Sequence, residues 1–152
     1  MQKIDPIKYS DLISKCGESG SKTGFITAPF PFVLYLNGDK SKPCRNFYGH
    51  EMIYPAVYDA LKDILEIYGQ YFISQNGLDE YGGCFADRPS RGLTRTSAHA
   101  WGMAIDYLPS RGRLGSPSLI PYHIVQAFKI RGFIWGGDWE RRDGMHFSGV
   151  IE

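Results

Sequence analysis

Cysteine is scarce in this sequence, and its spacing fits neither a disulfide framework nor a thiolate metal site. Only three cysteines occur among 152 residues, and no two of them form a CxxC pair. An odd number of widely spaced cysteines does not suit a disulfide-stapled domain, and thiolate zinc sites need closely spaced pairs. We therefore expect Cys16, Cys44 and Cys84 to be reduced, buried thiols.

Long apolar runs and an excess of one charge are also absent. No stretch approaches the roughly 18 apolar residues of a membrane span, and charged side chains interrupt residues 2–15, where a secretion signal would lie. The 17 lysines and arginines against 16 acidic residues give a formal net charge of +1, which is too little for a binder of polyanions. We expect no secretion signal, no stable membrane association, no nucleic-acid partner, and a monomer.

The length and composition are those of one globular domain over residues 1–152. Hydrophobic residues make up 43% of the chain and charged residues 22%, which are ordinary globular values. The aromatic fraction of 14% is high, and we attribute it to core packing more than to a substrate groove. Residues 1–24 are expected to form an N-terminal arm and loop, with a short helix or docked arm at 5–16 and a flexible stretch at 17–24.

Hydrophobic periodicity predicts two helices. Apolar residues at helical spacing favour a main core helix over 51–68, which Gly69 would end. A second helix is predicted over 119–131, with Ser118 as its N-cap and Pro121 in its first turn. Both helices would place one apolar face on the core.

The remaining apolar segments predict short strands. The run at 32–36 is expected at a sheet edge, because Pro29 and Pro31 precede it and proline cannot donate a ladder hydrogen bond. The other predicted strands lie near Cys84 and at 103–108, 133–135 and 145–150. The fold class is therefore α+β, a small antiparallel sheet packed with helices.

The segment SAHAWGMAID, residues 97–106, holds a histidine and an aspartate that cannot share one regular element. His99 and Asp106 are seven residues apart, so a single strand would point them to opposite faces, and Gly102 would weaken a helix. We expect His99 on a loop or strand end, a turn near Gly102, and Asp106 on a β-strand among apolar neighbours. A carboxylate buried in that position needs a cation or hydrogen bonds.

A second pair, Asp143 and His146 in DGMHF, can face the same cleft because a spacing of three suits one tight turn. Two imidazoles and one carboxylate can hold zinc with a position left for water, and a spare carboxylate can act as the base. Asp143 could instead be a solvated turn residue. The combination nevertheless favours a metal-dependent hydrolase.

These motifs resemble those of a known family. SAHAWGMAID is similar to the S-x-H-x-x-G-x-A-x-D signature of the M15 zinc D,D-peptidases, and DGMHF, residues 143–147, to their closing acid-x-x-His element. GGCFADRPSRG, residues 82–92, resembles the arginine-bearing segment of the phage-type branch, and WGGDW, residues 135–139, resembles the run before the last ligand. The resemblance covers about residues 45–150.

The resemblance implies a Hedgehog/D,D-peptidase-like fold and a role for each matching residue. Zn²⁺ would be held by His99, Asp106 and His146, Asp143 would be the general base, and Arg88 a cation on the substrate side. An aspartate at 143, where the dipeptidase and carboxypeptidase branches usually carry glutamate, resembles the L-alanyl-D-glutamate endopeptidases of bacteriophage endolysins. The implied partner is the peptidoglycan stem peptide.

An endolysin would be made in the host cytoplasm and act on the cell wall after release. Two other functions stay open. A D-alanyl-D-alanine carboxypeptidase would use the same metal site, and a Hedgehog-like binding module could keep the zinc without catalysis.

Several other residues are candidates for substrate contact. Arg88 or Arg91 could polarise the scissile carbonyl or bind a substrate carboxylate. Ser97 could hydrogen-bond the substrate or a ligand, or serve a turn. Trp139 and Trp101 could form cleft walls or core. The two histidines expected to be structural are His50 and His123.

Overall fold

A six-stranded sheet forms the centre of the computed structural model, which describes residues 2–88 and 95–152. The strand order is β3-β2-β4-β5-β7-β6, with β2 and β4 parallel and all other neighbours antiparallel. The strands are β2 (Phe25–Leu36), β3 (Pro43–His50), β4 (Glu80–Gly83), β5 (Ala104–Tyr107), β6 (Ile134–Trp135) and β7 (His146–Ser148). A separate parallel pair joins β1 (Ile7–Lys8) to β8 (Val150–Ile151).

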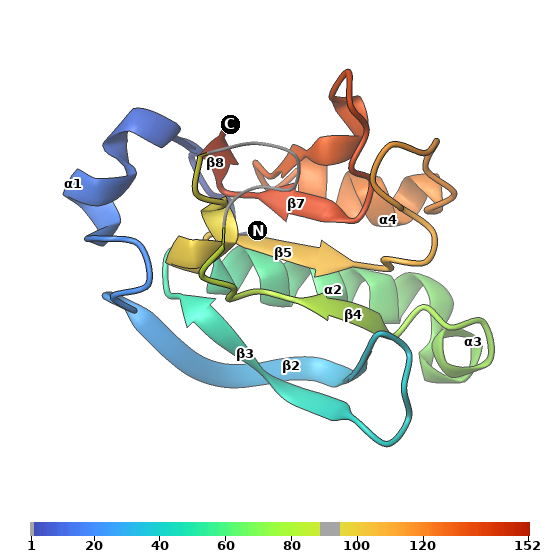
Figure 1. Cartoon of the computed structure of the whole chain (residues 1–152). Coiled ribbons are helices and arrows are strands. Elements are labelled where there is room, and N and C mark those ends of the chain that lie inside the picture. The colour runs from blue at the N-terminus through green and yellow to red at the C-terminus, as the bar shows by residue number, and fades with distance from the viewer. Residues whose placement is uncertain (1, 89–94) are drawn as a thin grey trace.

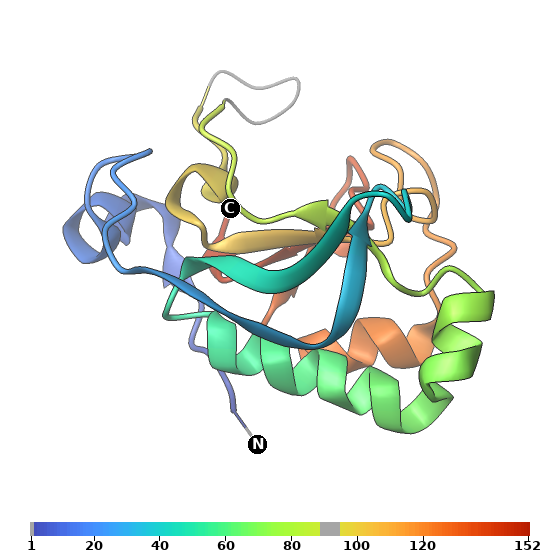
Figure 2. The same cartoon turned by 90° about the horizontal axis from the view of Figure 1, so that it is seen from below.

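Two helices lie along one face of this sheet, as Figures 1 and 2 show. The longer helix, α2 (Tyr54–Tyr68), carries Pro55 in its first turn and ends at Gly69, whose φ of 78° a side chain would disfavour. The second, α4 (Tyr122–Lys129), packs beside it. The predicted α+β class is confirmed, and the sheet is mixed through its one β2/β4 pair.

The core lies between the helices and the sheet. Its helical side is contributed by residues at i, i+3, i+4 and i+7 spacing, the arrangement that buries one face of a helix. On α2 these buried residues are Ala56, Val57, Ala60, Leu61 and Ile64. All four residues of β5 are buried, so Asp106 is a carboxylate on a strand that otherwise belongs to the core.

Three predictions about the elements were wrong. Strand β2 lies between β3 and β4 rather than at an edge. Its pairing with β3 shifts register between Pro29 and Leu34, and this irregularity in the ladder accommodates the hydrogen-bond donors that the prolines lack. Ser118 does not cap α4, since its hydroxyl accepts from the Ile120 amide and the helix begins only after Pro121. The predicted strand at 145–150 is divided into β7 and β8 at Gly149.

The N-terminal residues form a docked arm. After β1, a 3-10 turn η1 (Tyr9–Asp11) leads into the short helix α1 (Leu12–Cys16). Strand β3 and helix α3 (Gln70–Gln75) have no counterpart among the predicted elements. Within the part of the chain that the structure describes, no helix has the length and apolar character needed to cross a bilayer. The three cysteines are free thiols, but Cys44 is only half-buried, so its predicted burial was wrong.

Candidate active site

Three neighbouring elements bring two histidines and an aspartate together. His99 lies on the 3-10 turn η2 (Ala98–Trp101), Asp106 on β5 and His146 on β7. Asp106 and His146 are directly opposite each other in the antiparallel β5/β7 ladder. Gly102 turns the chain from η2 into β5 with a φ of 64°, and a Cβ there would lie 2.8 Å from the His50 amide nitrogen. This turn returns His99 to Asp106, as the odd spacing predicts.

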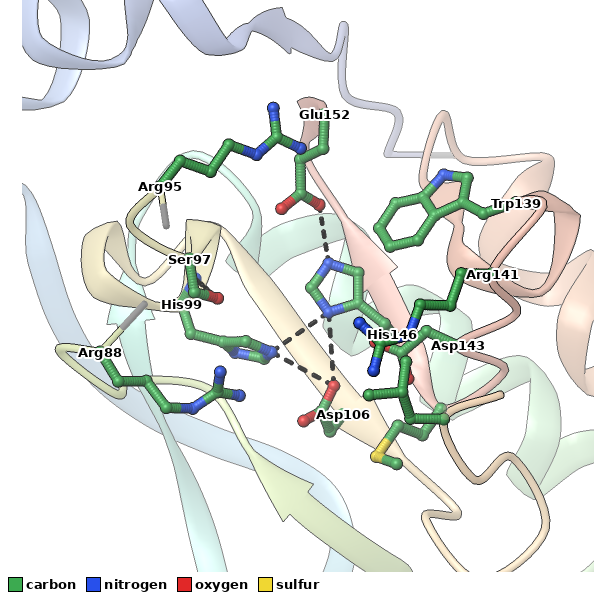
Figure 3. Close-up of a pocket in the computed structure, with 12 residues that line it drawn as sticks. Arg88, Arg95, Ser97, His99, Asp106, Trp139, Arg141, Asp143, His146 and Glu152 are labelled. Atoms are coloured by element: carbon green, nitrogen blue, oxygen red, sulfur yellow. Dashed lines mark hydrogen bonds and ion pairs between the residues drawn. The ribbon is translucent and has the colours of Figure 1, made fainter. Parts of the chain in front are cut away.

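The ligand atoms of these three residues converge on one point (Figure 3). His99 Nε2 lies 3.2 Å from Asp106 Oδ1, His146 Nδ1 lies 3.2 Å from His99 Nε2, and His146 Nδ1 lies 3.4 Å from Asp106 Oδ1. All three residues are buried, with 3%, 8% and 4% of their surface exposed for His99, Asp106 and His146. The cluster is therefore a triangle of three nitrogen and oxygen atoms largely shielded from water.

The size of this triangle fits a zinc ion. Tetrahedral zinc binds nitrogen and oxygen at about 2.0–2.1 Å, which sets neighbouring ligand atoms about 3.3 Å apart. The three separations in the cluster, 3.2, 3.2 and 3.4 Å, match that edge length. Two imidazoles and one carboxylate are also the mixed donor set of catalytic zinc sites. His99, Asp106 and His146 would thus hold the ion and leave a fourth position open.

Hydrogen bonds on the far side of each imidazole decide which nitrogen faces the cluster. His99 Nδ1 lies 2.6 Å from the Cys84 carbonyl oxygen, so its Nε2 points inward. His146 has the opposite arrangement, because its Nε2 lies 2.8 Å from Glu152 Oε2 and its Nδ1 points inward. A ring nitrogen that donates outward leaves the other nitrogen with a lone pair for a metal.

Without an ion, electrostatic interactions between His146 and the carboxylates of Asp106 and Glu152 hold the cluster together. Burial alone would lower the pKa of His146, but its hydrogen bonds to Asp106 and Glu152 outweigh this effect and raise that pKa to about 10. Burial tends to raise the pKa values of Asp106 and Glu152, but the neighbouring histidines hold both below their usual range. In the zinc-free protein, a protonated His146 therefore lies between two carboxylates, where a cation is electrostatically favoured.

The cluster lines a pocket of about 200 Å³. Four other residues proposed from the sequence line it too: Arg88, Ser97, Trp139 and Asp143. Arg91 lies outside the described residues. The lining residues that the sequence reasoning missed are Arg95, Leu114, Arg141, Met145 and Glu152.

Asp143 is placed by the turn that precedes β7. Its amide donates to the Gly136 carbonyl at 2.9 Å, and its own carbonyl accepts from the His146 amide at 3.0 Å. A Cβ on Gly136 would lie 2.4 Å from the Asp143 carbonyl oxygen, so glycine allows this close approach. The spacing of three therefore puts Asp143 and His146 on one side of a tight turn, and both line the pocket (Figure 3).

The other candidates separate into pocket and core. Ser97 caps η2, since its hydroxyl accepts from the His99 amide at 3.3 Å, and this contact orients the backbone of a candidate ligand. Trp139 lies against His146 with ring centroids 5.3 Å apart. Trp101 belongs to the core, where its Nε1 donates to the Gly17 carbonyl at 2.9 Å. His50 and His123 lie outside the ligand cluster.

The missed residues had little local signal. Arg95 lies two residues before Ser97 in the sequence, and only the fold shows that it lines the pocket, with its guanidinium over the Tyr9 ring at 4.7 Å. Glu152 follows His146 by six residues, a spacing that no regular element brings into contact. Cys84 was considered only as a thiol, but it takes part through its carbonyl oxygen.

Comparison with protein families adds an independent observation. Residues 91–149 match the model of the Peptidase_M15_4 family, described as D-alanyl-D-alanine carboxypeptidase. The match supports a peptidase of the M15 family. It includes all three ligand candidates and Asp143. No curated protein and no solved structure matches the chain.

Proposed function

We propose that this protein is a zinc-dependent peptidase that hydrolyses the peptide stem of peptidoglycan between L-alanine and D-glutamate. One observation carries the proposal: three buried ligand atoms with the spacing of a zinc tetrahedron lie in a pocket that also contains Asp143. A purely structural zinc site is closed by protein ligands and has no use for a base beside it. The non-catalytic binding module is disfavoured on this ground.

The chemistry divides between the ion and the chain. Zinc, when bound by His99, Asp106 and His146, supplies a Lewis acid for a water molecule and for the scissile carbonyl. Asp143 accepts a proton from the attacking water as the water oxygen bonds to the carbonyl carbon. Asp143 then returns that proton to the nitrogen as the C–N bond breaks, so the products are a free amine and a carboxylic acid, which then ionises to the carboxylate.

The arginines of the pocket support an anionic substrate. Among the described residues, Arg88, Arg95 and Arg141 contribute three positive charges to a lining that also contains three carboxylates. A divalent ion would leave the occupied pocket net positive, which favours a ligand with free carboxylates. Stem peptides carry such groups on D-glutamate and on the diamino acid, and guanidinium groups bind carboxylates through paired hydrogen bonds. Arg88 is also our candidate for stabilising the oxyanion.

The choice of peptide bond rests on position 143. The aspartate there resembles the residue that the endolysin branch carries at this position. For an endolysin, we place synthesis in the host cytoplasm and the substrate in the wall, reached after the membrane has been breached. The second candidate is D-alanyl-D-alanine carboxypeptidase activity, which the description of the matched family favours. Both reactions would use the same metal and the same base.

A digest of purified peptidoglycan by the zinc-loaded protein tests the proposal. Mass spectrometry should find stem peptides that begin with D-glutamate and glycan fragments that retain L-alanine. Loss of only the terminal D-alanine would support the carboxypeptidase instead. The matched control is Asp143→Asn, which keeps the shape of the side chain but removes its basicity. If the wild-type protein binds zinc but releases neither product, the proposed function is wrong.

A further inference from the structure

Glu152 lies beyond every sequence motif of the site, yet its carboxylate contacts His146, one of the three candidate metal ligands. We propose that Glu152 is a positioning residue that fixes His146 in the tautomer and ring orientation needed to bind metal. The inference rests on the proposed zinc site and names a residue that the family resemblance does not include. It concerns how this chain prepares one ligand, independently of which peptide bond is cut.

The contact between Glu152 and His146 is short and shielded. Glu152 Oε2 lies 2.8 Å from His146 Nε2, and each side chain is only 5% exposed. An ionised carboxylate accepts hydrogen bonds and cannot donate them, so the imidazole ring must carry a proton on Nε2 to make this contact. The neutral ring then has its lone pair on Nδ1, the nitrogen that lies 3.2 Å from His99 Nε2 and 3.4 Å from Asp106 Oδ1.

The contact between Glu152 and His146 requires a bend in the backbone after β7. In a straight strand, residues six apart would be separated by about 20 Å. Here the chain leaves β7 at Gly149, whose amide donates to the Met103 carbonyl at 2.7 Å. A Cβ at Gly149 would lie 2.8 Å from Ile53 Cγ2, so the bend needs glycine to pass the core. Ser148 supports the bend by accepting from the Val150 amide at 3.0 Å.

The N-terminal arm holds the strand that follows the bend. Ile7 pairs with Val150 and Lys8 with Ile151 in the parallel β1/β8 pair, and the Ile7 amide donates to the Gly149 carbonyl at 3.0 Å. Figure 1 shows β8 beside the N-terminal segment at the upper edge of the molecule. Strand β8 thus has a partner outside the main sheet, and this pairing sets Glu152 over His146.

Zinc affinity is the measurement that tests the role. Wild-type protein, Glu152→Ala and Glu152→Gln would be titrated with zinc in competition with a chromophoric chelator, and each affinity would be corrected for the protons released on binding, because Glu152 also raises the pKa of His146. Loss of a hydrogen-bonding partner behind a metal-bound histidine typically weakens metal binding about 10- to 100-fold, and we expect Glu152→Ala to fall in that range. Glutamine can accept from Nε2 but also donate to it, so Glu152→Gln should show a smaller loss. Glu66→Ala, an exposed glutamate on α2, is the matched control.

A second readout separates positioning from a merely structural role. Nitrogen NMR of the wild-type protein with zinc should show the His146 proton on Nε2.

Wild-type zinc affinity in a folded Glu152→Ala variant would overturn the inference, as would a His146 proton on Nδ1. If Glu152→Ala does not fold, Glu152→Gln and the wild-type spectrum decide. Tight zinc binding by the wild type without any wall digestion would refute the proposed function and leave this test intact.

Discussion

Zinc and protons should compete for the same nitrogen of His146, so zinc affinity is expected to rise with pH. In the zinc-free protein, Asp106 and Glu152 raise the pKa of this ring to about 10, against the effect of burial. At pH 7 only about one molecule in 10³ would carry the neutral ring. Since a metal binds only neutral imidazole, zinc must displace a proton from His146.

The magnitude follows from the distance between that pKa and the working pH. Each pH unit corresponds to about 1.4 kcal/mol, so protonation of His146 should reduce the free energy of zinc binding at pH 7 by about 4 kcal/mol. The apparent association constant should therefore rise about tenfold per pH unit from this group between pH 7 and pH 9. The zinc-bound water can release a second proton, which makes a direct titration of the ring necessary.

The stability of the zinc-free protein should depend on pH in the opposite direction. A pKa raised by folding stabilises the fold fully below about 6.5, the unfolded value, and this contribution is lost as the pH rises through the folded pKa of about 10. The Tm measured in chelator should therefore fall between pH 6.5 and pH 10. The zinc-loaded protein lacks that proton and should not show the same fall.

NMR titration of His146 in zinc-free protein and calorimetric zinc titrations in two buffers of different ionisation enthalpy would measure these effects. The titrations should detect at least one proton released per zinc at pH 7.5. A zinc-free midpoint near 6.5 for His146, or a zinc affinity that is constant between pH 7 and pH 9, would refute the reasoning.

Four other predictions follow from the site and the core. Asp106→Ala should abolish stoichiometric zinc binding by elemental analysis, and full occupancy would contradict the ligand set. Asp143→Asn should retain zinc and lose about 10²- to 10⁴-fold in peptide cleavage, whereas loss of zinc would place Asp143 among the ligands. Arg95→Ala should raise KM for stem peptides more than it lowers kcat, and an unchanged KM would remove it from the substrate contacts. Tyr107→Phe, which removes a buried hydroxyl donor to the Leu78 carbonyl, should cost about 1–3 kcal/mol in urea unfolding, and an unchanged midpoint would contradict that role.

The ligand arrangement could be anticipated because its constraints are local. The odd spacing of His99 and Asp106 and the glycine between them excluded one helix and one strand, and the structure contains the expected turn with Gly102 in the left-handed region. The main helix was equally accessible, since its apolar residues keep one face over four turns. Its observed start at Tyr54, three residues later than predicted, reflects Pro55, which suits only a first turn.

The order of the strands in the sheet could not be predicted from local spacing. The prolines before residue 32 indicated an edge strand, and the reasoning would hold for a regular ladder. Strand β2 instead spans Phe25–Leu36, and its register shift with β3 lies where the prolines are. A register shift of this kind depends on which strands become neighbours, and strand pairing is decided by contacts between residues far apart in the chain. The residue pattern within one strand therefore does not predict the register shift.

The candidate active site also depends partly on local spacing and partly on contacts between distant residues, which explains why Glu152 was missed. The three proposed ligands and the proposed base lie in two short motifs, where spacing restricts the possible geometry. The hydrogen bond from His146 to Glu152 needs a bend at Gly149 and a partner strand from the N-terminal arm, more than 140 residues away in sequence. A motif can therefore name the atoms that would bind a metal. The orientation and proton affinity of those atoms depend on groups that only the complete fold brings to them, and in this chain the arm and the last strand supply one such group.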